Sequence, residues 1–441
     1  MAQNADLEEA DGVAFADRSG IAEQPWLKYT HWRRRALLLI LFLVSASSTI
    51  DYYIISVTLE PIKGEFGVSD TVLGLLSGAC FSLIYAIAGL PIARWADRGN
   101  RRAIITISLA GWSIMTMACG AARNVWQLAL ARFGQGLVEP GALPTANSLI
   151  ADYYPPENRC LAVSILNASS AVGWLAGISL GGYLAATLGW RAAFFVAGVS
   201  GLVLAVFTQS FLDEPRRAMH FVDAPAQESM WGTLRSLFRK RTYVWALSGL
   251  ALYSVFNFGM TIFAPSFMIR ALHANLKEIS TSWSVAVSIA NFGGAIVGGR
   301  LADRLGRSKP NLYALLPTLS FILAAPLYVA ALFARDLGTF IRWDVLAEAT
   351  LAAGLFSSFA VLHAVCGGKR RATAIALVVF AMTLVGGGLG PLLVGLLSDL
   401  FQVQSGTDSL RYSLLISVTF LLAGAAVFYR SSRTLVAEVE S

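Results

Sequence analysis

Three ionisable residues lie inside stretches of the chain that are otherwise apolar. Asp51 falls in the run 36–59, and Arg132 and Glu139 fall in the run 126–151. A charged side chain at the centre of a bilayer costs roughly 2.5–3.5 kcal/mol on insertion scales, and such residues usually face a bundle interior or a water-filled path. A carboxylate that takes up a proton loses its charge and avoids this cost. The pattern therefore favours a proton-coupled transporter as the first hypothesis.

The depths of these residues predict that they lie close together. At 1.5 Å per residue, Arg132 is about 9 Å and Asp51 about 12 Å from the same end of their spans, so they can pair across two helices. Glu139 follows Arg132 by almost two turns and projects from the same face. One arginine neutralises one carboxylate at a time, and desolvation favours the neutral form of the other. We predict that the three residues couple transport to protons; the alternative is a static ion pair beside a neutral acid.

The composition places nearly all of the chain in a membrane. The sequence is 56% hydrophobic and 14% charged, with a mean hydropathy of +0.61, whereas about a quarter of the residues of a soluble domain are charged. Apolar runs of about 20 residues span a bilayer as helices. The predicted fold class is an all-α membrane protein with twelve transmembrane helices, centred near residues 47, 82, 112, 138, 172, 201, 255, 288, 322, 355, 386 and 420.

No enzyme site is apparent in the sequence. The chain has no nucleotide-binding P-loop, and no cluster of His and Cys offers metal ligation. We therefore expect no enzyme activity, no metal and no cofactor, with protons as the coupling ion.

Basic residues predict the orientation in the membrane. When the predicted spans alternate from a cytosolic N-terminus, 25 of the 34 Lys and Arg residues fall on the cytosolic side. This asymmetry is a positive-inside signal. It predicts cytosolic termini in a bacterial-type inner membrane, and it directs the net charge of +7 to the lipid surface rather than to nucleic acid. The expected partners are the bilayer and a small amphipathic substrate, and the expected state is a monomer.

A long charged stretch divides the chain into two halves. We predict a disordered cytosolic tail at 1–30, a six-helix bundle at 31–212, a cytosolic linker at 213–241, a second six-helix bundle at 242–432 and a tail at 433–441. Residues 230–238 of the linker read either as an amphipathic helix at the membrane surface or as plain linker.

The same short box occurs between the second and third helices of each half. It spans 93–102 in the first half and 299–307 in the second. An acid in this box can accept hydrogen bonds from a helix N-terminus, and the arginines can pair with carboxylates or lipid phosphates. We predict a latch at the cytosolic side, against the alternative that basic loops only set the topology. The predicted latch residues are Asp97, Arg98, Asn100, Arg101, Arg102, Asp303, Arg304 and Arg307.

The doubled box and the twelve spans resemble the major facilitator superfamily over roughly residues 33–430. The resemblance implies two six-helix bundles around a central cavity, which rock between inward-open and outward-open states. The stretch 132–140, RFGQGLVEP, is similar to two branches: the spinster family of lysolipid and sphingosine-phosphate transporters, and the organic-anion:cation symporters. The box DRGNRR at 97–102 and the run 147–159 favour spinster. The chain departs from that family at Tyr52, where an arginine is usual, and at Ala93, where glycine is usual.

Aromatic residues of the seventh span suggest an apolar wall for a substrate cavity, although packing or lipid contact explains them equally well. No ionisable residue is expected deep in the second half. The predicted cargo is a lysophospholipid or a sphingolipid-like amphiphile. The alternatives are an organic-anion or drug transporter, and, outside the transporters, a receptor or lipid scramblase. The predicted cavity residues are Tyr52, Tyr53, Phe256, Asn257, Thr261 and Phe356.

Overall fold

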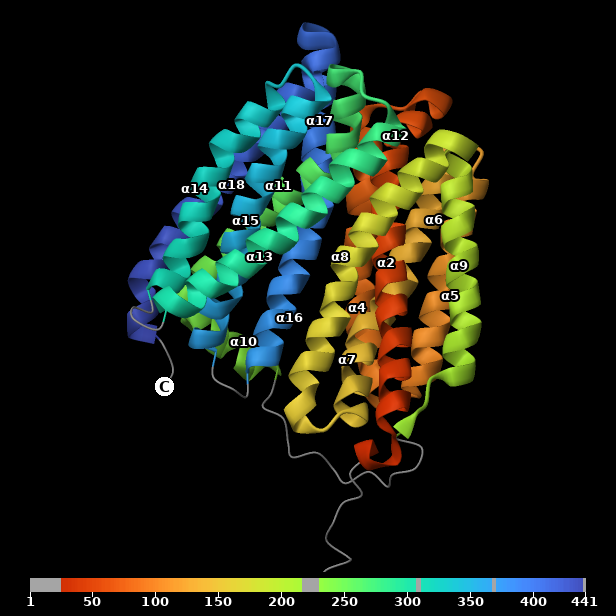
Figure 1. The fold of residues 1–441 in the computed structure, drawn as a ribbon, viewed down its shortest axis with the longest axis vertical. Helices are drawn as coiled ribbons and strands as arrows, with labels where there is room; N and C mark the ends of the chain where they lie inside the picture. The colour runs from red at the N-terminus through yellow and green to blue at the C-terminus, as the bar shows by residue number, and fades with distance from the viewer. Residues whose placement is uncertain (1–24, 216–229, 307–310, 367–369, 439–441) are drawn as a thin grey trace, which may run out of the picture.

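The protein is a bundle of long helices. The structure, a computed structural model, describes residues 25–215, 230–306, 311–366 and 370–438, and every regular element in these ranges is helical (Figure 1). Ten segments are long and apolar enough to cross a membrane. One of them, Thr373–Leu435, holds two helical segments, and the described segment 125–153 is a further one. The twelve predicted spans are therefore confirmed. Most of the predicted tail 1–30 lies outside the described residues, at 1–24. Of the predicted tail 433–441, only 439–441 lie outside them, and residues 433–438 continue the last helix.

The first half contains six continuous helical segments. Two of them change helix type along their length, at η2 and η3. The elements are η1 (Pro25–Lys28), α2 (His31–Phe66), α3 (Asp70–Gly74), η2 (Leu75–Ala79), α4 (Cys80–Arg98), α5 (Arg101–Ala121), α6 (Val125–Val138), η3 (Glu139–Gly141), α7 (Ala142–Tyr153), α8 (Pro156–Leu188) and α9 (Trp190–Phe211).

The second half repeats this plan after a short helix, α10 (Met230–Arg239), at the position of the predicted amphipathic stretch. Leu237 of α10 is buried and Phe238 is exposed. The remaining elements are α11 (Arg241–Leu272), α12 (Leu276–Glu278), η5 (Ile279–Trp283), α13 (Ser284–Gly306), α14 (Leu312–Leu332), α15 (Leu337–Val365), α16 (Arg371–Ala381), η6 (Met382–Gly387), α17 (Gly388–Ser405), η7 (Gly406–Asp408) and α18 (Ser409–Glu438).

A shared irregularity confirms that the halves are repeats. The second span of each half begins with a short α-helix that passes into a π-helical turn, η2 in one half and η5 in the other. The two turns begin 204 residues apart, and the two boxes are offset by 206. Single π-turns inside helices occur frequently at functional sites.

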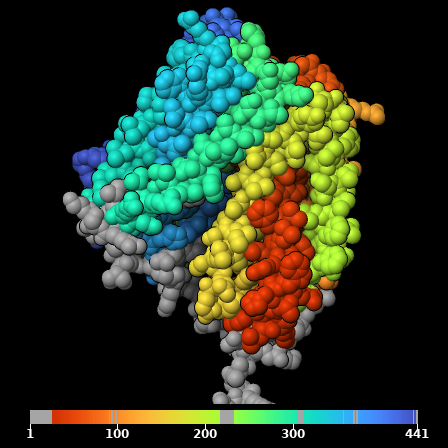
Figure 2. Space-filling model, in the orientation of Figure 1, coloured from red at the N-terminus to blue at the C-terminus, as the bar shows by residue number. Residues whose placement is uncertain are grey.

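The two halves meet at one end of the bundle and separate toward the other. We call these the α12 end and the α10 end, after the short helices found there (Figure 1). Helices α8 and α13 approach each other near the α12 end. Toward the α10 end they diverge, and the surface between them is hollowed (Figure 2). The hollow leads into the space between the halves.

Glycines allow the helices to approach closely. A Cβ atom on Gly395 would lie 2.1 Å from the carbonyl oxygen of Asp70, where α17 crosses α3. A Cβ atom on Gly136 would lie 2.6 Å from the carbonyl oxygen of Phe81, where α6 crosses α4. Small residues at such crossings bring backbones together without a hydrophobic driving force.

Two neighbouring glycines of α13 give a matched test of this packing. A Cβ atom on Gly298 would lie 2.0 Å from the carbonyl oxygen of Ala353 in α15, whereas a Cβ atom on Gly299 meets nothing within 4 Å. We expect Gly298→Ala to lower the melting temperature in detergent, because overpacking costs about 1–3 kcal/mol. Gly299→Ala should leave it unchanged or raise it. Equal melting temperatures for the two variants would contradict this packing.

Candidate functional site

The three predicted coupling residues are buried in the first half. Asp51 lies in the middle of α2, Arg132 in α6 and Glu139 in η3, and their side chains are 2%, 1% and 7% exposed. The α-helical pattern of this span stops at Val138, just before Pro140, and η3 follows. The proline, which lacks an N–H, accounts for this change of helix type.

Asp51 and Arg132 are linked through two polar side chains and do not form the expected direct ion pair. The Thr116 hydroxyl donates to Asp51 Oδ2 at 3.0 Å. Gln135 Nε2 donates to the same hydroxyl oxygen at 2.7 Å, and Arg132 Nη1 donates to Gln135 Oε1 at 2.9 Å. No sequence pattern singles out Thr116, whereas Gln135 follows Arg132 by three residues and so shares its helix face.

Arg132 keeps donor capacity that the described residues do not use. Its Nε donates to the carbonyl oxygen of Leu76 in η2 at 3.3 Å, whereas Nη2 is buried and has no hydrogen-bond partner in the described part of the chain. The guanidinium lies 5.2 Å from the ring centroid of Phe81 and 6.0 Å from that of Tyr52. The cation is therefore held by a carbonyl, an amide and two aromatic faces, without a carboxylate.

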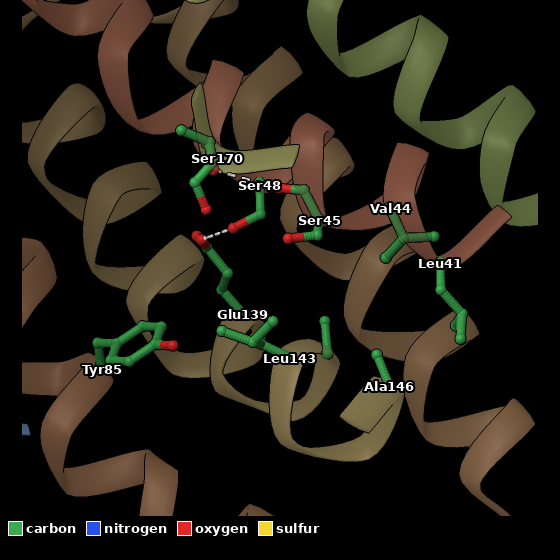
Figure 3. Close-up of a pocket in the computed structure, with 11 residues that line it drawn as sticks. Leu41, Val44, Ser45, Ser48, Tyr85, Glu139, Leu143, Ala146 and Ser170 are labelled. Atoms are coloured by element: carbon green, nitrogen blue, oxygen red, sulfur yellow. Dashed lines mark hydrogen bonds between the residues drawn. The ribbon is translucent and has the colours of Figure 1, made fainter. Parts of the chain in front are cut away.

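Glu139 faces a different set of groups. The Ser48 hydroxyl of α2 donates to Glu139 Oε1 (Figure 3). Glu139 lines a small pocket of about 70 Å³ together with Tyr85 and Ser170 (Figure 3). It also lines the large cavity between the halves. This acid is therefore the member of the trio that borders a space which a substrate or water can enter.

The large cavity has a volume of about 930 Å³, near the upper end of the usual range for ligand pockets. Four predicted residues, Tyr52, Tyr53, Asn257 and Thr261, lie in its wall. Phe256 does not: it is fully buried and packs edge-on against Tyr328, with ring centroids 4.8 Å apart. Its neighbour Phe258 faces the cavity instead. Consecutive helical residues point about 100° apart, so the rotation of α11 about its axis decides which phenylalanine faces the cavity. The side chain of Phe356 lies outside the described part of the structure.

The expectation that the second half has no deep ionisable residue is wrong. Asp344 and Glu348 lie one turn apart in α15; Asp344 is buried and Glu348 lines the large cavity. Trp283 Nε1 donates to Asp344 Oδ2 at 2.6 Å. Tyr328 and Asn291 donate to the two oxygens of Glu348, at 2.8 and 3.2 Å.

Several charged residues, among them Arg335, Asp336 and Arg342, precede this pair in the sequence and make the start of the helix hard to recognise. In the structure α15 begins at Leu337, because Asp336 caps it by accepting a hydrogen bond from the backbone N–H of Thr339 at 2.9 Å. That hydrogen bond lowers the pKa of Asp336 below its usual value. The spacing of four residues between Asp344 and Glu348 is the signal that was available, since it places both on one helix face.

The first box closes contacts within its own half. Asn100 caps α5 by accepting from the backbone N–H of Ala103 at 3.1 Å. Arg101 is fully buried and pairs with Asp152 at 2.5 Å and with Glu214 at 2.8 Å. Glu214 also accepts from the backbone N–H of Arg101, so this linker acid occupies the α5 N-terminus.

The rest of the predicted latch is less constrained. Arg102 Nη1 lies 3.5 Å from the carbonyl oxygen of Leu212, and Asp303 and Arg304 are exposed. The side chains of Asp97 and Arg98, and the whole of Arg307, lie outside the described part. The described contacts of the box therefore tie α5, α7 and the end of α9 together rather than joining the halves.

A partly buried ion network around the fully buried Asp70 joins the halves at the α12 end. Arg270 of α11 donates to both oxygens of Asp70, at 2.7 and 2.8 Å, and to Glu60 at 2.6 and 2.9 Å. Asp399 of α17 accepts from the backbone N–H groups of Asp70 and Thr71, at 2.9 and 2.8 Å. None of these network residues is among the residues singled out from the sequence.

Two repeated six-helix halves around a central cavity define the architecture of a secondary transporter. A model of the Major Facilitator Superfamily matches residues 41–334. The chain belongs to this superfamily. Both this family and the fold of the chain are those of transporters rather than enzymes.

The chain is similar to several transport proteins in sequence or structure. An MFS-type efflux pump of Mycolicibacterium smegmatis is 32% identical over 91% of this chain and 94% of its own length. A cis,cis-muconate transport protein of Acinetobacter baylyi is 28% identical over 69% and 73%. The solved structure of a bacterial homolog of the human lysosomal transporter Spinster, inward-facing and unoccupied, superposes with a TM-score of 0.86 at 28% identity. It covers 94% of this chain and 100% of that one. The spinster-like resemblance is confirmed.

The hydroxyl between Asp51 and Gln135 can be tested against another buried threonine. Thr116→Val removes the donor to Asp51 and the acceptor for Gln135, and we expect a loss of about 1–3 kcal/mol of stability because buried partners lose their hydrogen bonds. Thr145→Val is the control, since Thr145 Oγ1 is buried and has no partner among the described residues. Thermal unfolding in detergent measures both; a melting temperature for Thr116→Val as high as that of Thr145→Val would contradict the linkage.

Proposed function

We propose that the protein is a proton-coupled secondary transporter that moves an amphipathic, lipid-like substrate by alternating access. The observation that carries this proposal is the pair of buried acids, Asp51 and Glu139, neither of which forms an ion pair in the described part of the chain, beside a cavity that one of them borders. A buried carboxylate without a cation partner is costly when charged. Proton uptake removes that cost, so the acids can exchange protons as their access to water changes.

The hydrogen bonds from Asp51 through Thr116 and Gln135 to Arg132 can transmit the protonation state of Asp51 to the arginine. The Thr116 hydroxyl has one proton and two acceptors within reach, Asp51 Oδ2 at 3.0 Å and the carbonyl oxygen of Trp112 at 2.9 Å. Protonated Asp51 no longer needs that donor, so the hydroxyl can turn to Trp112. The Thr116 oxygen that accepts from Gln135 is then oriented differently. This change reaches Arg132, because Arg132 donates to Gln135. In this proposal the proton on Asp51 alters the hold on Arg132 across α2, α5 and α6.

The ion network and the opening of the cavity suggest which state the structure represents. With the α10 end at the cytosol, as the positive-inside pattern predicts, the network around Arg270 closes the outer side and the hollow between α8 and α13 opens inward. We propose an inward-open monomer in a bacterial inner membrane, with both termini in the cytosol. The exposed arginine of the second box, Arg304, would meet lipid phosphates or carboxylates on this side.

The substrate class rests on the cavity wall. It is large, and aromatic side chains such as Trp174 and Phe292 supply much of its surface. A lysophospholipid or sphingolipid-like molecule fits such a wall. An organic anion is the second candidate because the muconate transport protein is a relative. Measuring transport of a lysophospholipid and of an organic anion by the same protein distinguishes the two candidate substrate classes.

Neutral replacements of the coupling acids test the proposal. We expect Asp51→Asn and Glu139→Gln to abolish uptake of a fluorescent lysophospholipid into proteoliposomes driven by an imposed pH gradient, while both variants keep their melting temperatures. Glu157→Gln, an exposed change at the start of α8, should transport like the wild type. Wild-type rates from both coupling variants would refute proton coupling, and gradient-driven uptake of muconate but not of the lysolipid would favour the anion class.

The ion network predicts the conformational balance. Arg270→Gln removes the charge that joins α11 to Asp70 and Glu60, and breaking a buried pair costs about 3–5 kcal/mol. We expect the α12 ends of the halves to separate more often, which single-molecule energy transfer between labels at Arg123 and Arg335 reports. Arg342→Gln is the control because Arg342 is exposed and bonds only within its own helix. An unchanged distribution in Arg270→Gln would show that the network does not hold this end closed.

A further inference from the structure

The wall of the large cavity carries negative but no positive side chains in the described part of the chain. Glu139 enters the wall from the first half and Glu348 from the second, and the described lining residues include no Lys or Arg. Arg132 is 1% exposed and is absent from the wall; the rings of Tyr52 and Phe81, which do line the cavity, lie against its guanidinium. The cavity therefore presents two carboxylates on opposite faces.

Glu348 is held in a fixed orientation by side chains of other helices. Tyr328 Oη of α14 donates to Oε1 at 2.8 Å, and Asn291 Nδ2 of α13 donates to Oε2 at 3.2 Å. A carboxylate has about four lone-pair sites, so these two bonds leave acceptor capacity on both oxygens. Asp344, one turn earlier in α15, is buried and accepts from Trp283 Nε1 at 2.6 Å. The Glu348 carboxylate is therefore held in one orientation before any ligand binds.

Aromatic faces surround the space between the two carboxylates. Tyr53, Trp174 and Tyr253 line the cavity, and the Tyr53 and Trp174 rings are 6.4 Å apart in an edge-to-face arrangement. Tyr52 lines the same cavity, and its hydroxyl is buried and has no hydrogen-bond partner among the described residues. Aromatic faces attract organic cations most strongly where water is displaced. The wall combines this attraction with a fixed carboxylate.

We propose that Glu348 and the aromatic wall bind the ammonium group of the transported molecule, so that the substrate is a cationic or zwitterionic amphiphile. The cation would offset the charge of a carboxylate that is otherwise costly in this setting, and its apolar part would lie against the aromatic side chains. An organic anion would meet two carboxylates in the same space. This inference rests on the proposed function in taking the cavity as the transport site, and it adds the charge of the cargo.

Two probe ions of almost equal size and opposite charge test the inference. Tetraphenylphosphonium is a cation and tetraphenylborate an anion. We expect wild-type protein in phosphatidylcholine nanodiscs to bind tetraphenylphosphonium at least roughly tenfold more tightly than tetraphenylborate, a ratio that corresponds to 1.4 kcal/mol. Quenching of tryptophan fluorescence measures both affinities, because Trp174 lines the cavity. The ring of Trp283 packs against that of Trp174, with centroids 5.9 Å apart. Empty nanodiscs correct for partition into lipid.

Charge variants assign the preference to Glu348. Glu348→Gln keeps the size of the side chain and should lose most of the preference for the cation. Glu348→Asp keeps the charge and should retain a reduced preference. Glu157→Gln, an exposed carboxylate outside the cavity, should behave as the wild type. Equal affinities for the two ions in the wild type, or a full preference in a Glu348→Gln variant with an unchanged melting temperature, would overturn the inference.

The same measurements separate this inference from the proton-coupling proposal. A Glu348-dependent preference for the cation in a protein that shows no gradient-driven transport supports the cation site and removes the coupling. Gradient-driven lysolipid transport without any preference for the cation supports the coupling and overturns the cation site.

Discussion

The organisation of the cavity depends on one buried ion network, in which Asp70 is the central acid. Asp70 is completely buried, and it accepts from Arg270, from Lys63 at 2.6 Å and from the Ser398 hydroxyl at 2.6 Å. The network draws groups from α2, α3, α11 and α17, which come from both halves. A buried charge that loses its partner is strongly destabilising, so these helices are held together at the α12 end. Close backbone approach between α3 and α17 reinforces the contact.

At the α10 end, where the halves separate, the described ionic contacts each lie within one half. Arg101 pairs with Asp152 and Glu214, all within the first half and its adjoining linker. In the second half, Glu438 of α18 accepts from the backbone N–H groups of Arg241 and Thr242, again without a contact to the other half. These described ionic contacts each stay within one half, so they provide no attraction across the gap. The halves therefore lean together at one end and apart at the other.

Three acids in or beside the cavity have hydrogen bonds but no cationic partner among the described residues. Asp51 contacts a threonine, Glu139 a serine and Glu348 a tyrosine and an asparagine. Neutral donors orient a carboxylate while leaving its charge uncompensated. A proton or a cationic group that enters the cavity can supply the compensation. In our proposals Asp51 and Glu139 use the proton, and Glu348 uses the cationic group of the substrate.

Much of the architecture follows from the sequence alone. Apolar runs long enough to span a bilayer fixed the twelve helices, because an unpaired backbone in lipid is costly and helices satisfy it locally. The repeated box revealed the two halves, and the cost of buried charge singled out Asp51, Arg132 and Glu139. These inferences depend on composition and spacing along the chain, which local physics determines.

The partners of these residues were decided only by the tertiary structure. The link from Asp51 to Arg132 runs through Thr116, whose hydroxyl is ordinary in a helix until α5 packs beside α2 and α6. The choice between Phe256 and Phe258 for the cavity wall depends on the rotation of α11. Glu348 became a cavity residue because α15 begins as early as Leu337. Sequence periodicity sets which residues share a face, but the rotation of a helix and the neighbours it meets arise from packing between segments far apart in the chain.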